Sequence, residues 1–103
     1  MSFLYYISNS KIAGKGVFDS KNLNPLLNIG LGFSKINNTN KPDLDYKRTE
    51  LGSFCNHSST PNLYLKNVGN NYFFITLKKI KKDKELLVDY NKFNWDGKRD
   101  FIK

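Results

Sequence analysis

The sequence is poor in several residue types that define other classes of protein. Its 103 residues include one cysteine, one histidine and one tryptophan. The single cysteine, Cys55, excludes an internal disulfide and a multi-cysteine zinc site, and we expect no metal. No apolar run is long enough to cross a bilayer, and the first residues lack the basic start and long apolar stretch of a signal peptide. We therefore expect one soluble, intracellular domain over residues 1–103, without a membrane partner.

Acidic residues are scarce relative to basic ones. The chain has 17 basic and 9 acidic residues, a formal net charge of +8 at pH 7. Such a balance is typical of proteins that bind nucleic acid or another acidic partner, but a composition rich in lysine and asparagine explains it without any partner. The lysine-rich run 78–84 is interrupted by Ile80 and Asp83. A solvated turn between two strands explains this run more simply, so nucleic acid is not expected as a specific ligand.

Short segments rich in aromatic and β-branched residues predict a mainly β protein. In chain order, the expected strands are 3–8, a segment that leaves the glycine turn at 14–18, then 63–66, 72–77 and 86–90. Gly69, Asn70 and Asn71 predict a tight hairpin. Residues 20–48 are weakly patterned, and the polar stretch 37–43 within them is expected to be a loop. The aromatic tail 91–103 is compatible with a short helix or with an irregular segment.

Three short motifs are the best candidates for chemistry. The first is Gly14-Lys15-Gly16, where missing side chains let a ligand approach the backbone closely. The second is the polar segment 54–62, in which His57 follows Asn56; asparagine offers both a donor and an acceptor, which suits a zwitterionic ligand. The third, residues 85–90, is a short apolar strand that ends on an acid and a tyrosine.

In order and spacing, these motifs resemble the signatures of SET-domain protein lysine methyltransferases. The second follows the pattern N-H-S-x-x-P-N and the third the pattern E-L-x-x-D-Y, and the resemblance runs from about Ser8 to Trp95. It is closest to the minimal SET proteins of viruses. It implies a β-clip-like SET fold of several short strands in small sheets, with a knot-like C-terminal crossing that brings Asn56 and Tyr90 to one cofactor. Phe54, just before Asn56 in the second motif, is expected in the core.

The resemblance also implies a cofactor, S-adenosylmethionine, with S-adenosylhomocysteine as product. The residues implied to hold it are Gly14, Lys15, Gly16, Asn56, His57 and Trp95. Tyr90 is implied to be the catalytic residue. Methyl transfer to a lysine amine needs a neutral amine, an in-line approach and oxygen atoms around the methyl group, and it needs no metal.

The same resemblance implies a protein substrate with a target lysine, either a histone or a host protein. The residues expected to line the lysine channel are Tyr46, Tyr64, Val88 and Phe93. Phe93 and Trp95 would close the channel, although plain core packing explains them equally well. Residues 31–48 are expected to be a short insert in the peptide groove. A homodimer is left open, and a viral source would place the protein in the host cytoplasm or nucleus.

Two departures from the family pattern leave other functions open. Ser53 stands where the family commonly has arginine, and Val88 stands where an aromatic residue often tunes the number of methyl groups added. The product therefore stays open between mono-, di- and trimethyl-lysine. The alternatives to an enzyme are a SET scaffold that has lost turnover and docks a partner, and a small basic protein that binds nucleic acid.

Overall fold

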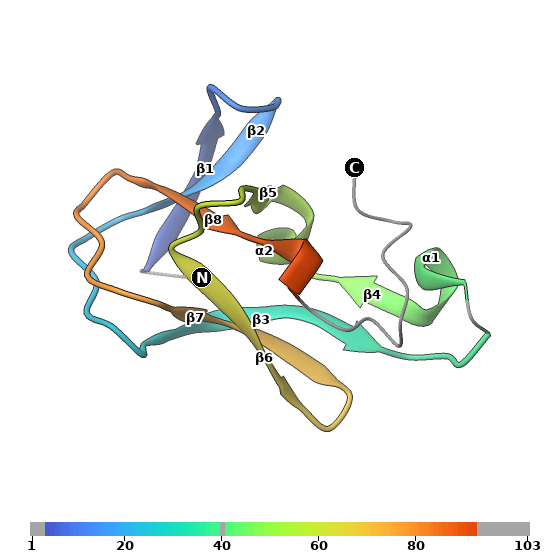
Figure 1. Cartoon of the computed structure of the whole chain (residues 1–103). Helices are drawn as coiled ribbons and strands as arrows, with labels where there is room; N and C mark the ends of the chain where they lie inside the picture. The colour runs from blue at the N-terminus through green and yellow to red at the C-terminus, as the bar shows by residue number, and fades with distance from the viewer. Residues whose placement is uncertain (1–3, 40, 93–103) are drawn as a thin grey trace.

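The computed structural model describes residues 4–39 and 41–92, and strands dominate it (Figure 1). Its strands are β1 (Tyr5–Asn9), β2 (Lys15–Asp19), β3 (Asn28–Lys35), β4 (Tyr46–Arg48), β5 (Asn56–His57), β6 (Leu63–Val68), β7 (Asn71–Thr76) and β8 (Glu85–Val88). Its helical turns are α1 (Pro42–Asp45), α2 (Glu50–Phe54) and the 3₁₀ turn η1 (Tyr90–Lys92). The mainly β class predicted from the sequence is confirmed. No helix in the described ranges is long and apolar enough to span a membrane.

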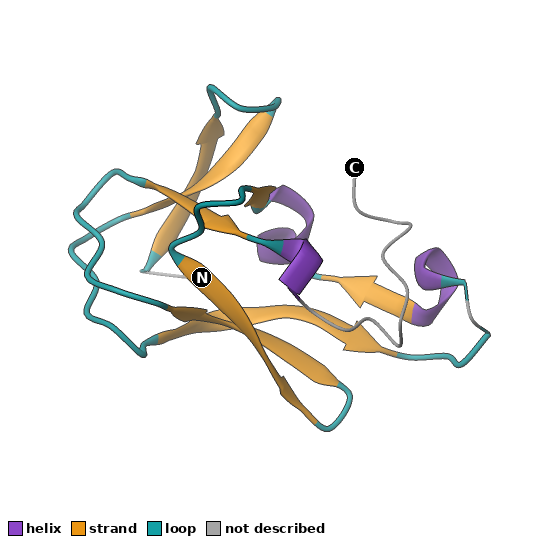
Figure 2. Ribbon diagram, in the orientation of Figure 1, coloured by secondary structure: helices purple, strands orange, loops and turns teal. Residues whose placement is uncertain are grey.

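The sheet is organised around β8. The strand order is β1-β2-β8-β6-β7-β3-β4, and β5 also pairs with β8. Pairing is antiparallel along most of the sheet, but β8 runs parallel to both β5 and β6. Figure 2 shows β8 between the β1–β2 hairpin and the longer strands β6, β7 and β3. The last strand therefore pairs with segments from the first and middle parts of the chain.

The predicted hairpin is confirmed by the pairing of β6 with β7. Val68 pairs with Asn71, which leaves Gly69 and Asn70 as a two-residue turn. Gly69 has φ +62°, in the left-handed region that glycine adopts without a steric penalty. The turn residues are thus those that a tight hairpin requires.

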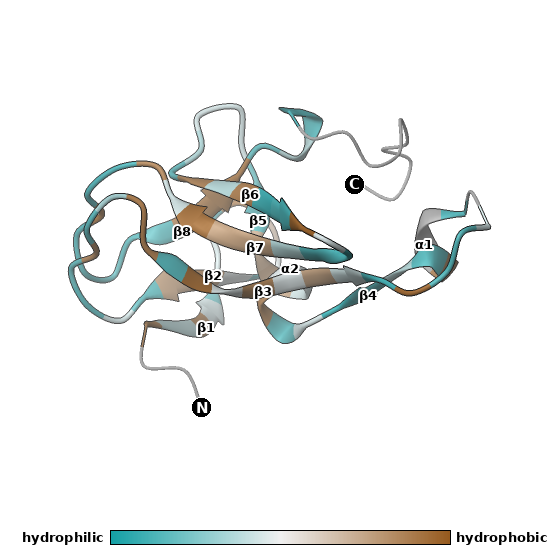
Figure 3. Ribbon diagram, turned by 90° about the horizontal axis from the view of Figure 1, so that it is seen from below, coloured by the Kyte–Doolittle hydropathy of each residue, from teal (hydrophilic) through white to brown (hydrophobic). Residues whose placement is uncertain are grey.

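The core lies on one face of the sheet. Leu63 and Leu65 of β6 and Phe74 of β7 are buried on this face. Tyr64 and Phe73, at alternate positions on the opposite face, are half-buried. Figure 3 shows apolar residues concentrated on the central strands and hydrophilic residues on the outer loops and the β6–β7 turn. Leu86 and Val88 of β8 have no exposed surface, so the strand that carries the third motif is also the centre of the core.

The weakly patterned region 20–48 contains more structure than predicted. It holds the eight-residue strand β3 and the short strand β4, and α1 begins inside the stretch expected to be a loop. Both ends of the expected peptide-groove insert at 31–48 are therefore strands of the sheet, residues 31–35 in β3 and 46–48 in β4, and α1 lies between them. Sequence alternation is hidden in β3 by bulges and by Gly32, where a Cβ atom would overlap the ring of Phe74.

Two further predictions about the motifs were wrong in detail. The last strand ends at Val88 rather than at Tyr90, because Asp89 turns the chain: its carboxylate accepts from the Asn91 N–H at 3.0 Å and its carbonyl from the Lys92 N–H at 3.2 Å. Phe54 is 36% exposed rather than buried. Tyr90 therefore lies in the turn after β8, and the second motif contacts the core through a residue other than Phe54.

At the end of α2 the chain becomes extended, with φ −71° and ψ 114° at Cys55. Cys55 consequently takes the core position that was expected for Phe54. The knot-like crossing and the single-domain boundary stay predictions, and the tail from residue 93 lies outside the described residues.

Candidate functional site

The candidate site forms where β8 lies between the β1–β2 hairpin and β5. Asn56 in β5 pairs in parallel with Leu87 of β8, which brings the second motif against the third. The Asn56 side-chain Nδ2 donates to the Glu85 carboxylate at 2.8 Å and to the backbone carbonyls of Ala13 and Lys15, both at 3.3 Å. One amide group therefore joins the glycine turn to the start of β8.

Glu85 is a site residue that the sequence reasoning missed. Its two carboxylate oxygens each lie 2.8 Å from the Ser10 hydroxyl, and that hydroxyl also accepts from Asn56 Nδ2 at 3.1 Å. A Cβ atom on Gly16 would overlap the Glu85 carboxylate, so the glycine makes room for it. The signal was present in the sequence, since Glu85 is the first residue of the E-L-x-x-D-Y pattern.

These contacts determine which end of the Asn56 amide is the donor. Nδ2 faces a carboxylate, a hydroxyl and two carbonyls, all of which accept hydrogen bonds. Oδ1 has no hydrogen-bond partner within the described ranges, and Asn56 is half-buried. Nearby Gly14, with φ +47°, is exposed with open space around it. An acceptor oxygen beside an open glycine turn suits a ligand that carries an ammonium group.

His57 connects this polar network to Tyr90. Its Nδ1 accepts a hydrogen bond from the Tyr90 backbone N–H at 3.2 Å, so this imidazole carries its proton on Nε2. The His57 and Tyr90 rings lie nearly parallel, with centroids 6.3 Å apart and an interplanar angle of 22°. The carboxylate of Asp89 lies 3.7 Å from the same Nδ1. The imidazole therefore positions the backbone and the ring of Tyr90 together.

The Tyr90 hydroxyl lies inside the protein among carbonyl oxygens. It donates to the carbonyl of Cys55 at 3.2 Å and lies 3.5 Å from the carbonyl of Gly52. Its ring packs edge-on against Phe33, with centroids 5.9 Å apart. Burial raises the pKa of Tyr90 well above its ordinary value, because it disfavours the phenolate. The hydroxyl is therefore a neutral hydrogen-bonding group and not a base.

The short helix α2 supplies one of these carbonyls. Thr49 caps the helix by accepting from the Gly52 N–H at 3.2 Å, and the last helical bond runs from the Cys55 N–H to the Leu51 carbonyl. The helix ends before its ladder reaches the carbonyl of Gly52, which is left to face Tyr90. A Cβ atom on Gly52 would overlap the carbonyl of Gly32, so glycine lets the helix approach β3 this closely.

Two of the expected channel residues lie in or beside the core. Val88 is fully buried and pairs with His57 and Leu63 in the parallel part of the sheet. Tyr46 is buried, with its ring edge-on to that of Tyr72 at 5.8 Å between centroids. Their roles in a lysine channel stay predictions.

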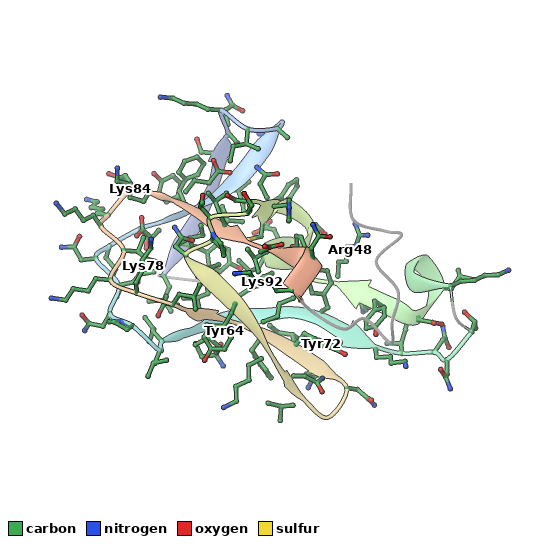
Figure 4. The ribbon with its side chains drawn as sticks, in the orientation of Figure 1. Arg48, Tyr64, Tyr72, Lys78, Lys84 and Lys92 are labelled. Carbon is green, nitrogen blue, oxygen red and sulfur yellow. The ribbon has the colours of Figure 1, made fainter. Side chains whose placement is uncertain are left out.

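Tyr64 is placed differently from the other expected channel residues. It lies on the face of β6 opposite to Leu63 and Leu65, where it lines a surface groove with Phe73 and Ile75. Figure 4 shows Tyr64 and Tyr72 on the neighbouring strands β6 and β7. The remaining expected residues of the site and channel, Phe93 and Trp95, lie outside the described residues.

Comparison with known proteins identifies the family and the fold. Residues 5–91 match the SET domain family, which includes all three motifs, and the chain belongs to that family. The fold is similar to that of the crystal structure of a candidate histone methyltransferase from Plasmodium falciparum. That similarity has a TM-score of 0.72 and 24% sequence identity, and it covers 92% of this chain and 99% of the other. No curated protein matches the sequence. Closeness to the minimal viral proteins stays a prediction.

Proposed function

We propose that this protein is a protein-lysine N-methyltransferase that transfers a methyl group from S-adenosylmethionine to the ε-amine of a lysine in a protein substrate. The observation that carries the proposal is the oxygen cluster formed by the Tyr90 hydroxyl and the carbonyls of Gly52 and Cys55. The hydroxyl is buried and lies near two backbone carbonyls, which together place three oxygen atoms at one point. It suits a reaction in which an amine and a polarised methyl group need several fixed oxygen atoms around them.

The chemistry needs positioning and little else from the protein. S-adenosylmethionine supplies a methyl group bonded to a positively charged sulfur. The lone pair of the neutral lysine nitrogen forms the new N–C bond as the C–S bond breaks, the bonding electrons go to sulfur, and the methylated nitrogen then loses a proton to water. The Tyr90 hydroxyl donates to the carbonyl of Cys55, and its oxygen would be an acceptor for the lysine N–H. Because burial raises its pKa, the hydroxyl keeps its own proton and does not protonate the lysine amine.

The residues proposed to bind the cofactor lie in and beside the polar network at the start of β8. The free Oδ1 of Asn56 would accept from the ammonium group of the methionine part, and the backbone of Gly14, Lys15 and Gly16 would lie along it. His57 would contact the remainder of the cofactor while holding Tyr90 through Nδ1. Glu85 and Ser10 would act indirectly, by holding the Asn56 amide in one orientation.

For the substrate we infer a lysine on a protein, with a histone as the first candidate. The Plasmodium relative is described as a candidate histone methyltransferase, and the fold is shared with it. A protein of net charge +8 repels a free basic peptide at long range, which favours a target whose own charge is neutralised by a partner. A homodimer stays a prediction.

Calorimetric titration with S-adenosylmethionine tests the cofactor site. We expect saturable binding by the wild-type protein and a loss of affinity of at least tenfold in Asn56→Ala. Asn38→Ala, which removes an exposed asparagine from the loop before α1, is the matched control and should bind normally. No binding by a folded wild-type protein would contradict the proposal and favour a docking scaffold.

Transfer of a radiolabelled methyl group into lysate proteins and histones then tests turnover. Label on lysine, absent without the enzyme, is the expected result. Cofactor binding without any label in either substrate pool would remove the transferase activity while leaving the cofactor site in place.

A further inference from the structure

The loop that joins β7 to β8 carries a dense set of positive charges. We call residues 78–84 the lysine loop; its exposed basic residues are Lys78, Lys79, Lys81, Lys82 and Lys84. Figure 4 shows Lys78 and Lys84 at the same end of the molecule, well apart from Arg48. The loop leads directly into Glu85, so it lies at the far end of β8 from Tyr90.

The lysine loop is a solvated turn whose backbone is nevertheless held by hydrogen bonds. Ile80 is 4% exposed, and it exchanges two backbone hydrogen bonds with Leu23, at 2.8 and 3.0 Å. The Lys82 N–H donates to the side chain of Asn22 at 2.9 Å. The lysine stems therefore start from fixed positions, which lowers the entropy lost when their charges engage a ligand.

Asp19 holds the end of the same loop. Its side chain accepts from the Lys84 N–H at 2.7 Å, its carbonyl accepts from the Asp83 N–H at 2.9 Å, and its own N–H donates to the Lys84 carbonyl at 3.0 Å. The carboxylate of Asp83 accepts from the Tyr6 hydroxyl at 2.9 Å. Asp19 and Asp83 thus bind backbone and tyrosine groups, and no ion pair joins the five lysines to any acid in the described ranges.

The lysine loop also borders a groove. Its volume is about 440 Å³, and it is lined by Lys78, Lys79, Ile80, Lys81, Lys84, Asn62, Glu85 and Leu87. The described lining contains no aromatic ring on which a base could stack. Glu85 also belongs to the lining, but its carboxylate bonds Ser10 and Asn56. The groove therefore has lysine charges along its border and, in the described lining, no surface on which bases could stack.

We propose that the lysine loop and its groove bind the phosphodiester backbone of double-stranded nucleic acid without reading its sequence. Lysine is a compact point charge that attracts phosphates without the bidentate geometry of arginine, so it favours contacts that do not depend on sequence. A membrane is the weaker candidate, because Ile80, the apolar residue within the loop, points inward. Leu77, just before the loop, is 46% exposed, so anionic membranes belong among the ligands tested.

None of the lysines of this site lies among the cofactor or catalytic residues described above, whereas Glu85 belongs to both the groove and the network around Asn56. Binding of nucleic acid would also explain how a protein of net charge +8 approaches a basic protein substrate. A lysine-bearing protein that is already bound to nucleic acid presents a negative field, which would attract a protein of net charge +8. The inferred substrate class is therefore a protein associated with nucleic acid.

Fluorescence anisotropy with a labelled DNA duplex, measured across salt concentrations, tests the proposal on the whole chain. If three to four lysines neutralise phosphates, log K should fall against log salt with a slope of about −3. The variant Lys78→Gln/Lys79→Gln/Lys81→Gln should lose at least tenfold in affinity and most of that slope. The charge-matched variant Lys41→Gln/Lys47→Gln/Lys66→Gln removes three exposed lysines elsewhere and should change affinity by less than threefold.

Parallel titrations with an RNA duplex, a single strand and vesicles containing phosphatidylserine separate the possible ligands. Binding of either duplex, lost in the lysine-loop variant alone, supports the proposal. Equal losses in the two triple variants would show a general effect of net charge and overturn it. Binding of vesicles without binding of duplexes would overturn it in favour of a membrane surface. Circular dichroism confirms that both variants are folded.

Discussion

The two ends of β8 differ in how far solvent reaches the side chains that they position. At its start, Glu85 is half-buried and holds the Asn56 amide in a network that water can reach. Just beyond its end, Tyr90 is 7% exposed and its hydroxyl lies against the backbone carbonyls of Gly52 and Cys55. The comparison teaches that a side-chain amide can be oriented by a carboxylate where solvent has access. Placement of a neutral hydroxyl requires a dry, rigid surround, where an interaction is stronger and less mobile.

The Tyr90 end should therefore be the more sensitive to a small steric change. In Gly52→Ala, the new methyl group would overlap the Gly32 carbonyl and push α2 away from β3. We expect a loss of about 2 kcal/mol in the free energy of unfolding, seen as a lower midpoint in thermal unfolding. Ser53→Ala, at an exposed position of the same helix, is the control and should change stability by less than about 0.5 kcal/mol. Equal stability of the two variants would contradict the close packing described here.

Removal of the hydroxyl itself should affect turnover more than binding. Tyr90→Phe keeps the ring against Phe33 but leaves the carbonyls of Gly52 and Cys55 without their donor. We expect methyl transfer to fall at least tenfold, about 1.4 kcal/mol in the barrier, with cofactor affinity within a few fold of wild type.

Single-turnover kinetics beside calorimetry measure the two effects separately. The control is Tyr6→Phe. This variant removes from β1 a hydroxyl that donates to Asp83, and it should leave transfer unchanged. Unchanged transfer in Tyr90→Phe would exclude Tyr90 from catalysis.

The Glu85 end should show the opposite pattern and the smallest effect. Glu85→Gln replaces a carboxylate that accepts from both Asn56 and Ser10 with an amide that accepts through one oxygen only. We expect cofactor affinity to fall about fivefold, near 1 kcal/mol, with turnover at saturating cofactor within about threefold of wild type. Glu50→Gln, an exposed acid in α2, serves as the control. A loss of turnover in Glu85→Gln at unchanged cofactor affinity would contradict the proposal that the Glu85 end acts on binding and the Tyr90 end on turnover.

Sequence reasoning succeeded where chemistry is local. The hairpin at Gly69 needed only a turn that accepts positive φ, and the motif at Asn56 and His57 carries its meaning in residue types and spacing. It failed at β3, where Gly32 and two register shifts conceal the alternation that marks a strand. It also failed at Phe54, because burial in a one-turn helix depends on what packs against it and not on hydrophobicity.

Glu85 shows a third kind of outcome. Its residue type and its place in the motif were visible, but its task was not, because that task depends on Ser10 and Gly16 from the other end of the chain. The lysine loop is similar: its charges were evident, whereas the hydrogen bonds that hold it come from Asn22 and Asp19 in distant parts of the sequence.

The sequence alone therefore determined the β class, the three motifs and the SET family, because these follow from local residue patterns and their order along the chain. Only the tertiary structure decided that the hydroxyl of Tyr90 meets the carbonyls of Gly52 and Cys55. It likewise decided that Asn56 is oriented by Glu85 and that the lysine loop is held in place. The physical reason is the same in each case: these contacts join residues far apart in the chain, and only the packing of β8 against β2, β5 and β6 brings them within hydrogen-bonding distance.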